Sequence, residues 1–263
     1  MPDGILQFLA GPFLIETPII FSWAVFLFAF GVFIFPNSRF LKRLGGIYKT
    51  DTSNRPDRSD TSDGSTRLTT SRSDTSDTSY KPYAHFYFRL LAAAAAFRFF
   101  ISFFETFLQY YVWKKNPLTE ILLVQPLSAD VPVPAFIRNI FFGNPRGYFF
   151  YYAWGHFFLN VFLSILSAIA FYYFLVFLRK YRARFFGEGE IVLGTLMAFL
   201  AGWPNVVLFV PLALILTVVI SVVRSIFWNK NYTTLGLPFL VSGFATLAFG
   251  KLLIELFHLG ALG

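Results

Sequence analysis

The sequence predicts an all-α fold, a polytopic membrane helix bundle of about six transmembrane helices. Three observations lead to this fold class. Hydrophobic residues make up 56% and aromatic residues 21% of the 263 residues, which leaves too little polar surface to cover a soluble fold. The apolar residues also gather in long runs, and Lys and Arg lie mainly in the connections between these runs.

The candidate spans are runs that can cross a hydrocarbon core about 30 Å thick, which takes about 20 apolar residues at about 1.5 Å each. They fall at residues 18–35, 86–113, 149–178, 205–227 and 235–258. A shorter run of about a dozen residues ends at Trp203-Pro204 and makes a sixth crossing if it is counted. The first run has Asp3 and no basic residues before it, so we expect a retained anchor rather than a cleaved signal peptide.

The basic residues predict the orientation. Most follow the first, third and fifth spans, which end on one side in a six-span topology, so that side is expected to be cytoplasmic and both termini external. They are Arg39, Lys42, Arg43, Lys49, Arg55, Arg58, Arg67, Arg72, Lys81, Arg179, Lys180, Arg182, Arg184, Arg224 and Lys230. The exceptions are Lys114, Lys115, Arg138 and Arg146. The expected localisation is the inner (cytoplasmic) membrane, and the net charge of +8 then indicates a lipid bilayer as partner and no nucleic acid.

Three regions are predicted along the chain. Residues 1–49 form an anchor span with a basic flank, and residues 50–79, with near-repeats of "SDTSD" and almost no apolar residue, form a disordered cytoplasmic loop. This loop reads as a solvated tether rather than a phosphorylated regulatory segment. Residues 80–263 form the membrane domain, in which a Pro-rich and aromatic external loop at 114–148 is expected to fold in the interface.

Four polar residues within the predicted spans are candidates for a polar seam, because ionisable and amide groups in a membrane usually face protein or water. Arg98 and Glu105 lie seven residues apart on one face of the second span, and we expect a structural pair there. His156 and Asn160 lie four apart in the third span and favour hydrogen bonding between helices. The alternative is a path for a small solute or for protons.

Cofactor and metal sites are not expected. The chain has no Cys and 3 His, which excludes disulfides, thiol nucleophiles and cysteine-ligated zinc and leaves no recognisable ligand set. A phosphate-binding loop is not expected either, since "GEGE" lacks the lysine of such loops and its acids repel phosphate.

The stretch "FFGEGEIVLGTLMAFLAGWP", residues 185–204, places two carboxylates between glycines where a basic segment meets an apolar run. Gly187 and Gly189 permit backbone conformations closed to other residues and are expected to shape a turn. Glu188 and Glu190 then fall in the first turn of a helix, where the helix dipole favours an anion. Taken alone, this pattern predicts a charged helix start.

The order of features around this turn resembles the C-terminal half of prepilin peptidases, the type IV leader peptidases that are GxGD-type membrane aspartic proteases. The resemblance covers residues 185–250, with "GEGE" in place of GxGD. The matching landmarks are the run Ile191-Val192-Leu193-Gly194, the pair Gly202-Trp203 and the pair Pro238-Phe239. The resemblance implies that Glu190 stands at the second catalytic aspartate and that Asp77 or Asp74, upstream of Pro82, stands at the first.

The implied activity is an aspartic endopeptidase that cleaves the leaders of pilin-like precursors at the cytoplasmic membrane face, without a cofactor. Two carboxylates that share a proton would activate water and protonate the scissile group. Glutamate keeps this chemistry with one methylene more than aspartate, so the sequence leaves open an active divergent protease and a descendant that lost activity. The alternatives are a non-catalytic scaffold or assembly factor of a type IV pilus or secretion machine, and a small-solute transporter.

Overall fold

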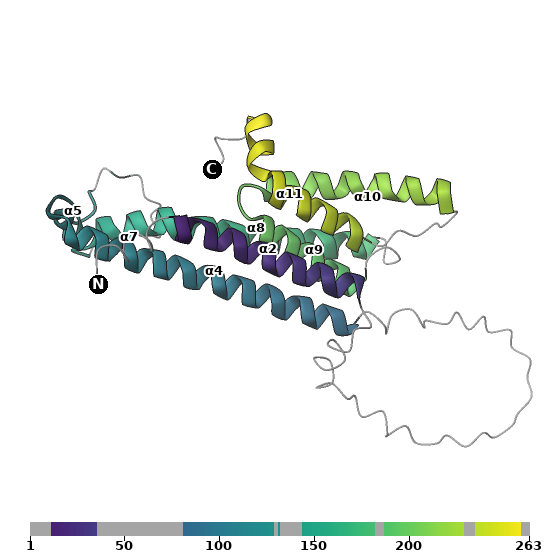
Figure 1. The fold of residues 1–263 in the computed structure, drawn as a ribbon, viewed down its shortest axis with the longest axis horizontal. Helices are drawn as coiled ribbons and strands as arrows, with labels where there is room; N and C mark the ends of the chain where they lie inside the picture. Colours follow the sequence, from purple (N-terminus) through teal and green to yellow (C-terminus); the bar gives the residue numbers. More distant parts are fainter. Residues whose placement is uncertain are drawn as a thin grey trace, which may run out of the picture.

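The computed structural model describes residues 12–35, 81–128, 131, 144–181, 187–228 and 235–258, and these residues contain helices and no strand. The all-α fold class is therefore confirmed over the described residues. Figure 1 shows the helices gathered into an elongated bundle. In chain order they are α2 (Pro12–Ile34), α4 (Lys81–Lys115), α5 (Pro117–Leu123), α7 (Gly147–Ala153), the π-helix η1 (Trp154–Phe158), α8 (Leu159–Tyr181), α9 (Glu188–Ala201), α10 (Val206–Trp228) and α11 (Gly236–Leu256).

Five segments of the described residues are long and apolar enough to cross a membrane. They are Glu16–Ile34, Ala84–Lys115, Gly147–Tyr181, Val206–Phe227 and Gly236–Leu256. The predicted sixth crossing does not reach this length. Helix α9 has 14 residues, which at about 1.5 Å each give about 21 Å against a core of about 30 Å.

Helix α9 compensates for its short length by lying inside the protein. Every residue from Leu193 to Ala201 is buried, and α4, α8 and α11 pack around the helix; Figure 1 shows it enclosed by its neighbours. Gly194 permits a close approach of α11 to α9, because a Cβ added to Gly194 would lie 2.8 Å from Cε2 of Phe239 on α11. Helix α9 is therefore a core helix shielded from lipid, while the five longer helices supply the outer surface.

Two contacts define how α9, α10 and α11 are threaded. The backbone N–H groups at the start of α11 donate to the carboxylate of Glu190 in the first turn of α9, so the two helices begin at the same level. A Cβ added to Gly250, late in α11, would lie 2.6 Å from Oδ1 of Asn205, which follows the end of α9. Helices α9 and α11 therefore run parallel, and α10 returns antiparallel to them, as the predicted topology requires.

The far end of the bundle carries two short helices, α5 in the predicted 114–148 loop and α7 at the start of the third long apolar segment. Helix α5 begins after Asn116, whose Oδ1 accepts a hydrogen bond from the backbone N–H of Leu118 at 3.1 Å. Trp113, Phe149 and Leu123 belong to a small hydrophobic cluster that joins α4, α5 and α7, and Figure 1 shows the two short helices together at one end. Residues 129–130 and 132–143 of this loop, and the 50–79 segment, lie outside the described residues.

Candidate acidic site at the start of helix α9

Glu190 links the first turns of two helices. Its Oε2 accepts a hydrogen bond from the backbone N–H of Gly187 at 3.3 Å, and the backbone N–H groups of Leu235 and Gly236 also donate to its carboxylate. These donors belong to the unpaired N–H groups that every helix start leaves free. Burial raises the pKa of Glu190 above the ordinary value, and the three backbone donors oppose that shift. The carboxylate is thus positioned by backbone atoms of both α9 and α11.

The two glycines of the "GEGE" turn do not play the conformational role expected of them. Gly187 has φ −69° and ψ 146°, an extended conformation that any residue adopts. Gly189 is a buried residue within α9. Among the described residues, the glycine with a positive φ is Gly202, at 68°, at the other end of the helix. Gly187 and Gly189 therefore lie at the start of α9 without a backbone conformation that requires glycine, whereas Gly202 has one.

Glu188 faces a different way from Glu190. Its Oε1 lies 3.4 Å from Nη2 of Arg179, near the end of α8, in a partly exposed ion pair. Both residues line a cavity of about 420 Å³, together with His85 of α4 and with Tyr172 of α8. The acid that faces open space is thus Glu188, whereas Glu190 faces the start of α11.

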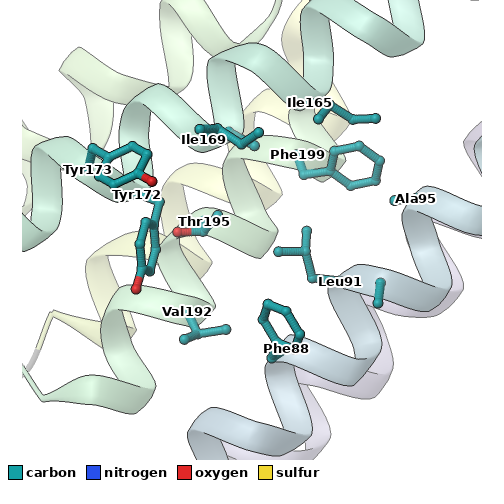
Figure 2. A pocket seen from close by; sticks show the side chains of 12 residues that line it. Phe88, Leu91, Ala95, Ile165, Ile169, Tyr172, Tyr173, Val192, Thr195 and Phe199 are labelled. Carbon is teal, nitrogen blue, oxygen red and sulfur yellow. The ribbon is translucent and has the colours of Figure 1, made fainter.

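A second cavity, of about 430 Å³, lies beside this one between α4, α8 and α9. Figure 2 shows the apolar side chains that line it, with Phe88 and Leu91 on α4 opposite Ile165 and Ile169 on α8. Phe88, Tyr172 and Val192 line both cavities, so the two adjoin. We call these two adjoining cavities together the α4–α8 groove.

Arg98 binds the end of α9. Its Nη2 donates to the backbone carbonyl oxygen of Leu200 at 3.1 Å and to Oγ of Ser22 at 3.4 Å, and its Nη1 donates to Oγ of Ser164 at 3.5 Å. The guanidinium carbon lies 5.0 Å from the centroid of the Phe199 ring. A cation at this place balances the negative end of the helix dipole and satisfies a terminal carbonyl group.

This arrangement corrects the predicted pair of Arg98 and Glu105. The hydrogen-bond and ion-pair partners of Arg98 among the described residues do not include Glu105. Seven residues of α-helix separate the two Cα atoms by about 10.5 Å along the axis, and the α9 carbonyl is nearer. The seam between helices is instead built by Ser22, Ser164 and the backbone.

Asn160 and His156, the other two candidates for the polar seam, make different contacts. The Asn160 backbone carbonyl oxygen accepts from Oγ of Ser164 at 2.7 Å, so Asn160 adjoins the Arg98 layer. His156 belongs to the π-helix that precedes α8. Its ring stacks on that of Tyr152 in α7, with the ring centroids 5.3 Å apart. Ser22 and Ser164 were not predicted from the sequence. The signal that could have pointed to them is a serine within an otherwise apolar span, in α2 and in α8.

Of the carboxylates predicted to be catalytic, the described residues include Glu190 alone. Asp74 and Asp77 lie outside the described residues. No group of three or more His, Cys, Asp or Glu that could hold a metal occurs among the residues that the structure places. Arg179 and His85, which line the same cavity as Glu188, were not predicted as site residues. In the sequence, Arg179 was interpreted only as part of a basic flank.

The fold and this site define a class, a multi-pass α-helical membrane protein with an acid-bearing helix start. Comparisons with protein-family models, with curated proteins and with solved structures found no match to this chain.

Proposed function

We propose that the chain is a prepilin-peptidase-like membrane protein, an aspartic-type endopeptidase that cleaves leaders of pilin-like precursors at the cytoplasmic membrane face. Glu190 would supply one carboxylate, and Asp77 or Asp74 the other. The observation that carries this proposal is the placement of Glu190, a partly buried acid that backbone donors of α9 and α11 hold at a helix start.

The residues that carry the resemblance also belong to one packing unit, which supports the proposal. Gly194 contacts Phe239, Glu190 receives the N–H of Gly236, and Gly202 forms the turn that ends α9. Residues separated by up to about 50 positions in sequence thus serve one purpose, the placement of a short acid-bearing helix. A raised pKa is also what a carboxylate needs to act as a proton donor near neutral pH.

The same contacts favour a second candidate, a non-catalytic scaffold or assembly factor of a pilus-like or secretion machine. In that case the carboxylate of Glu190 serves only to satisfy the N–H groups of Gly187, Leu235 and Gly236. Such a capping role needs an acceptor but no proton transfer.

Co-expression with a panel of candidate prepilins separates the two functions. If the chain is a protease, leader removal seen with wild type is lost in Glu190→Gln and in the Asp74→Asn/Asp77→Asn double variant, while Glu190→Asp retains or raises it. The matched control is Glu255→Gln, since Glu255 is an exposed acid near the other end of α11. Undiminished cleavage in every variant would remove these carboxylates from the mechanism.

A scaffold gives a different pattern. No leader is cut by the wild type, Glu190→Gln keeps its partners because the amide oxygen still accepts backbone hydrogen bonds, and deletion of residues 50–79 abolishes partner pull-down. Cleavage by the wild-type chain would contradict this second candidate.

A further inference from the structure

The α4–α8 groove has a closed floor and an open rim. Its floor is buried, with 4% of Thr195 and 1% of Phe199 exposed, whereas its rim residues Phe88 and Tyr173 are 62% and 66% exposed. The hydroxyl of Thr195 donates to the backbone carbonyl oxygen of Ile191, so its hydrogen-bonding need is met within α9. The groove therefore offers an apolar surface that opens sideways, at the level of the hydrocarbon core.

The length of the groove matches one leaflet. Its lining on α4 runs from Ala84 to Ala95, eleven helical steps or about 16 Å, while half of a hydrocarbon core is about 15 Å. Arg98, over the ring of Phe199, follows at the inner end. A groove of this length suits a single hydrocarbon chain that enters from the membrane surface.

The volume excludes a larger occupant from the cavity itself. A transmembrane helix about 10 Å across and 30 Å long fills about 2,400 Å³, several times the cavity of about 430 Å³. An extended acyl chain is narrower and flexible, and it makes the same contacts with Leu91, Ile165 and Ile169 that the bilayer would.

The mouth of the groove carries one charge of each sign. Arg179 and Glu188 are 32% and 44% exposed as side chains and 3.4 Å apart, and such exposed pairs hold together weakly. A guanidinium binds phosphate oxygens well, and a carboxylate accepts hydrogen bonds from a primary ammonium group. The two charges thus complement the two charges of a zwitterionic amine–phosphate headgroup.

We propose that the α4–α8 groove binds a glycerophospholipid of the leaflet on the Arg179 side, with an acyl chain between α4 and α8 and an ethanolamine-type headgroup at the mouth. The phosphate lies at Arg179 and the ammonium at Glu188. This site is separate from the proposed peptidase chemistry at Glu190, and its test needs no substrate cleavage.

The groove itself is tested by the lipid that stays bound to the purified full-length protein, measured by native mass spectrometry. Ala95→Phe fills the inner end of the groove and should remove most of the bound lipid. Ala96→Phe adds the same ring to an exposed neighbour that does not line the groove, and should leave bound lipid unchanged. Equal lipid retention in both variants, or no bound lipid in the wild type, would overturn the proposal.

The headgroup assignment is tested in bilayer nanodiscs that contain phosphatidylethanolamine, phosphatidylcholine or phosphatidylglycerol with matched acyl chains. Loss of one charge-assisted hydrogen bond corresponds to about tenfold in affinity. Arg179→Gln should therefore weaken all three lipids about tenfold, and Glu188→Gln should weaken only phosphatidylethanolamine by this factor. Equal affinities for the three lipids in the wild type, unchanged by Glu188→Gln, would refute the headgroup match.

A cross-linking experiment keeps the proposal testable if Ala95→Phe does not fold. A photoreactive amino acid in place of Ala92, an exposed groove residue, should capture phospholipid in native membranes. Capture of a polypeptide instead, either a second copy or another membrane protein, would show that protein covers the groove and would overturn the lipid assignment.

Discussion

Replacement of Arg98 with methionine removes the cation at the end of α9 and keeps an apolar side chain of similar length. Four interactions are lost with the guanidinium: the hydrogen bond to the carbonyl oxygen of Leu200 at 3.1 Å, the longer contacts to two serine hydroxyls, and the contact with the Phe199 ring at 5.0 Å. The carbonyl groups at the end of α9 are left in an apolar layer without water to satisfy them.

The expected destabilisation is about 2 kcal/mol. A hydrogen bond from a charged donor contributes about 1.5–3 kcal/mol, and a desolvated cation–π contact about 0.5–2 kcal/mol. The serine contacts are too long to add much. Removal of a buried cation relieves part of its desolvation cost, which offsets the sum and leaves about 2 kcal/mol of net loss.

Unfolding in mixed micelles with increasing fractions of a denaturing detergent, followed by circular dichroism, measures this loss. Lys251→Met is the matched control, because Lys251 is an exposed cation on α11 and its removal should change stability by less than about 0.5 kcal/mol. If Arg98→Met were as stable as Lys251→Met, the guanidinium would not hold the end of α9, and the reasoning would be wrong.

Three further predictions concern the ends of α9 and α11. Gly202→Ala should destabilise by at least about 2 kcal/mol, because φ is 68° and the new Cβ would lie 2.9 Å from Nη1 of Arg98; an unchanged unfolding midpoint would contradict this. Gly236→Ala should cost about 1–3 kcal/mol, since its Cβ would meet the ring of Phe33, and a Gly236→Ala, Phe33→Leu double variant should recover part of the loss. Because burial raises the pKa of Glu190, the stability it contributes is fully present below its unfolded pKa and is lost as pH rises through its folded pKa. Glu190→Gln should remove the part of the stability loss that sets in as pH rises above the ordinary carboxyl pKa, and an unaltered slope of stability against pH would refute the raised pKa.

Hydrophobic run length predicted the long helices well, because the cost of leaving backbone groups unpaired in lipid forces any long apolar run into a helix. The run at 205–227, for example, became α10, Val206–Trp228. Run length misled for α9, since a buried helix needs only protein neighbours and not the thickness of the bilayer. The expected crossing there is a short core helix.

The partners of single side chains were the least predictable part of the site. Spacing within one helix suggested Glu105 as the partner of Arg98, but the actual partners lie on α2, α8 and α9. The two acids of "GEGE" were likewise indistinguishable by composition. Only the packing of α11 shows that Glu190 meets backbone donors while Glu188 meets Arg179.

The contact between Arg98 and α9 has a consequence for how the chain enters the membrane. A 14-residue helix is too short to be held across a bilayer by partition into lipid alone, and a cation within a span is costly without a partner. Each segment supplies what the other lacks, although about 100 residues separate Arg98 from Leu200. The Arg98 guanidinium therefore gains its carbonyl partner only when α9 has packed against α4, so this contact makes two distant parts of the chain depend on each other.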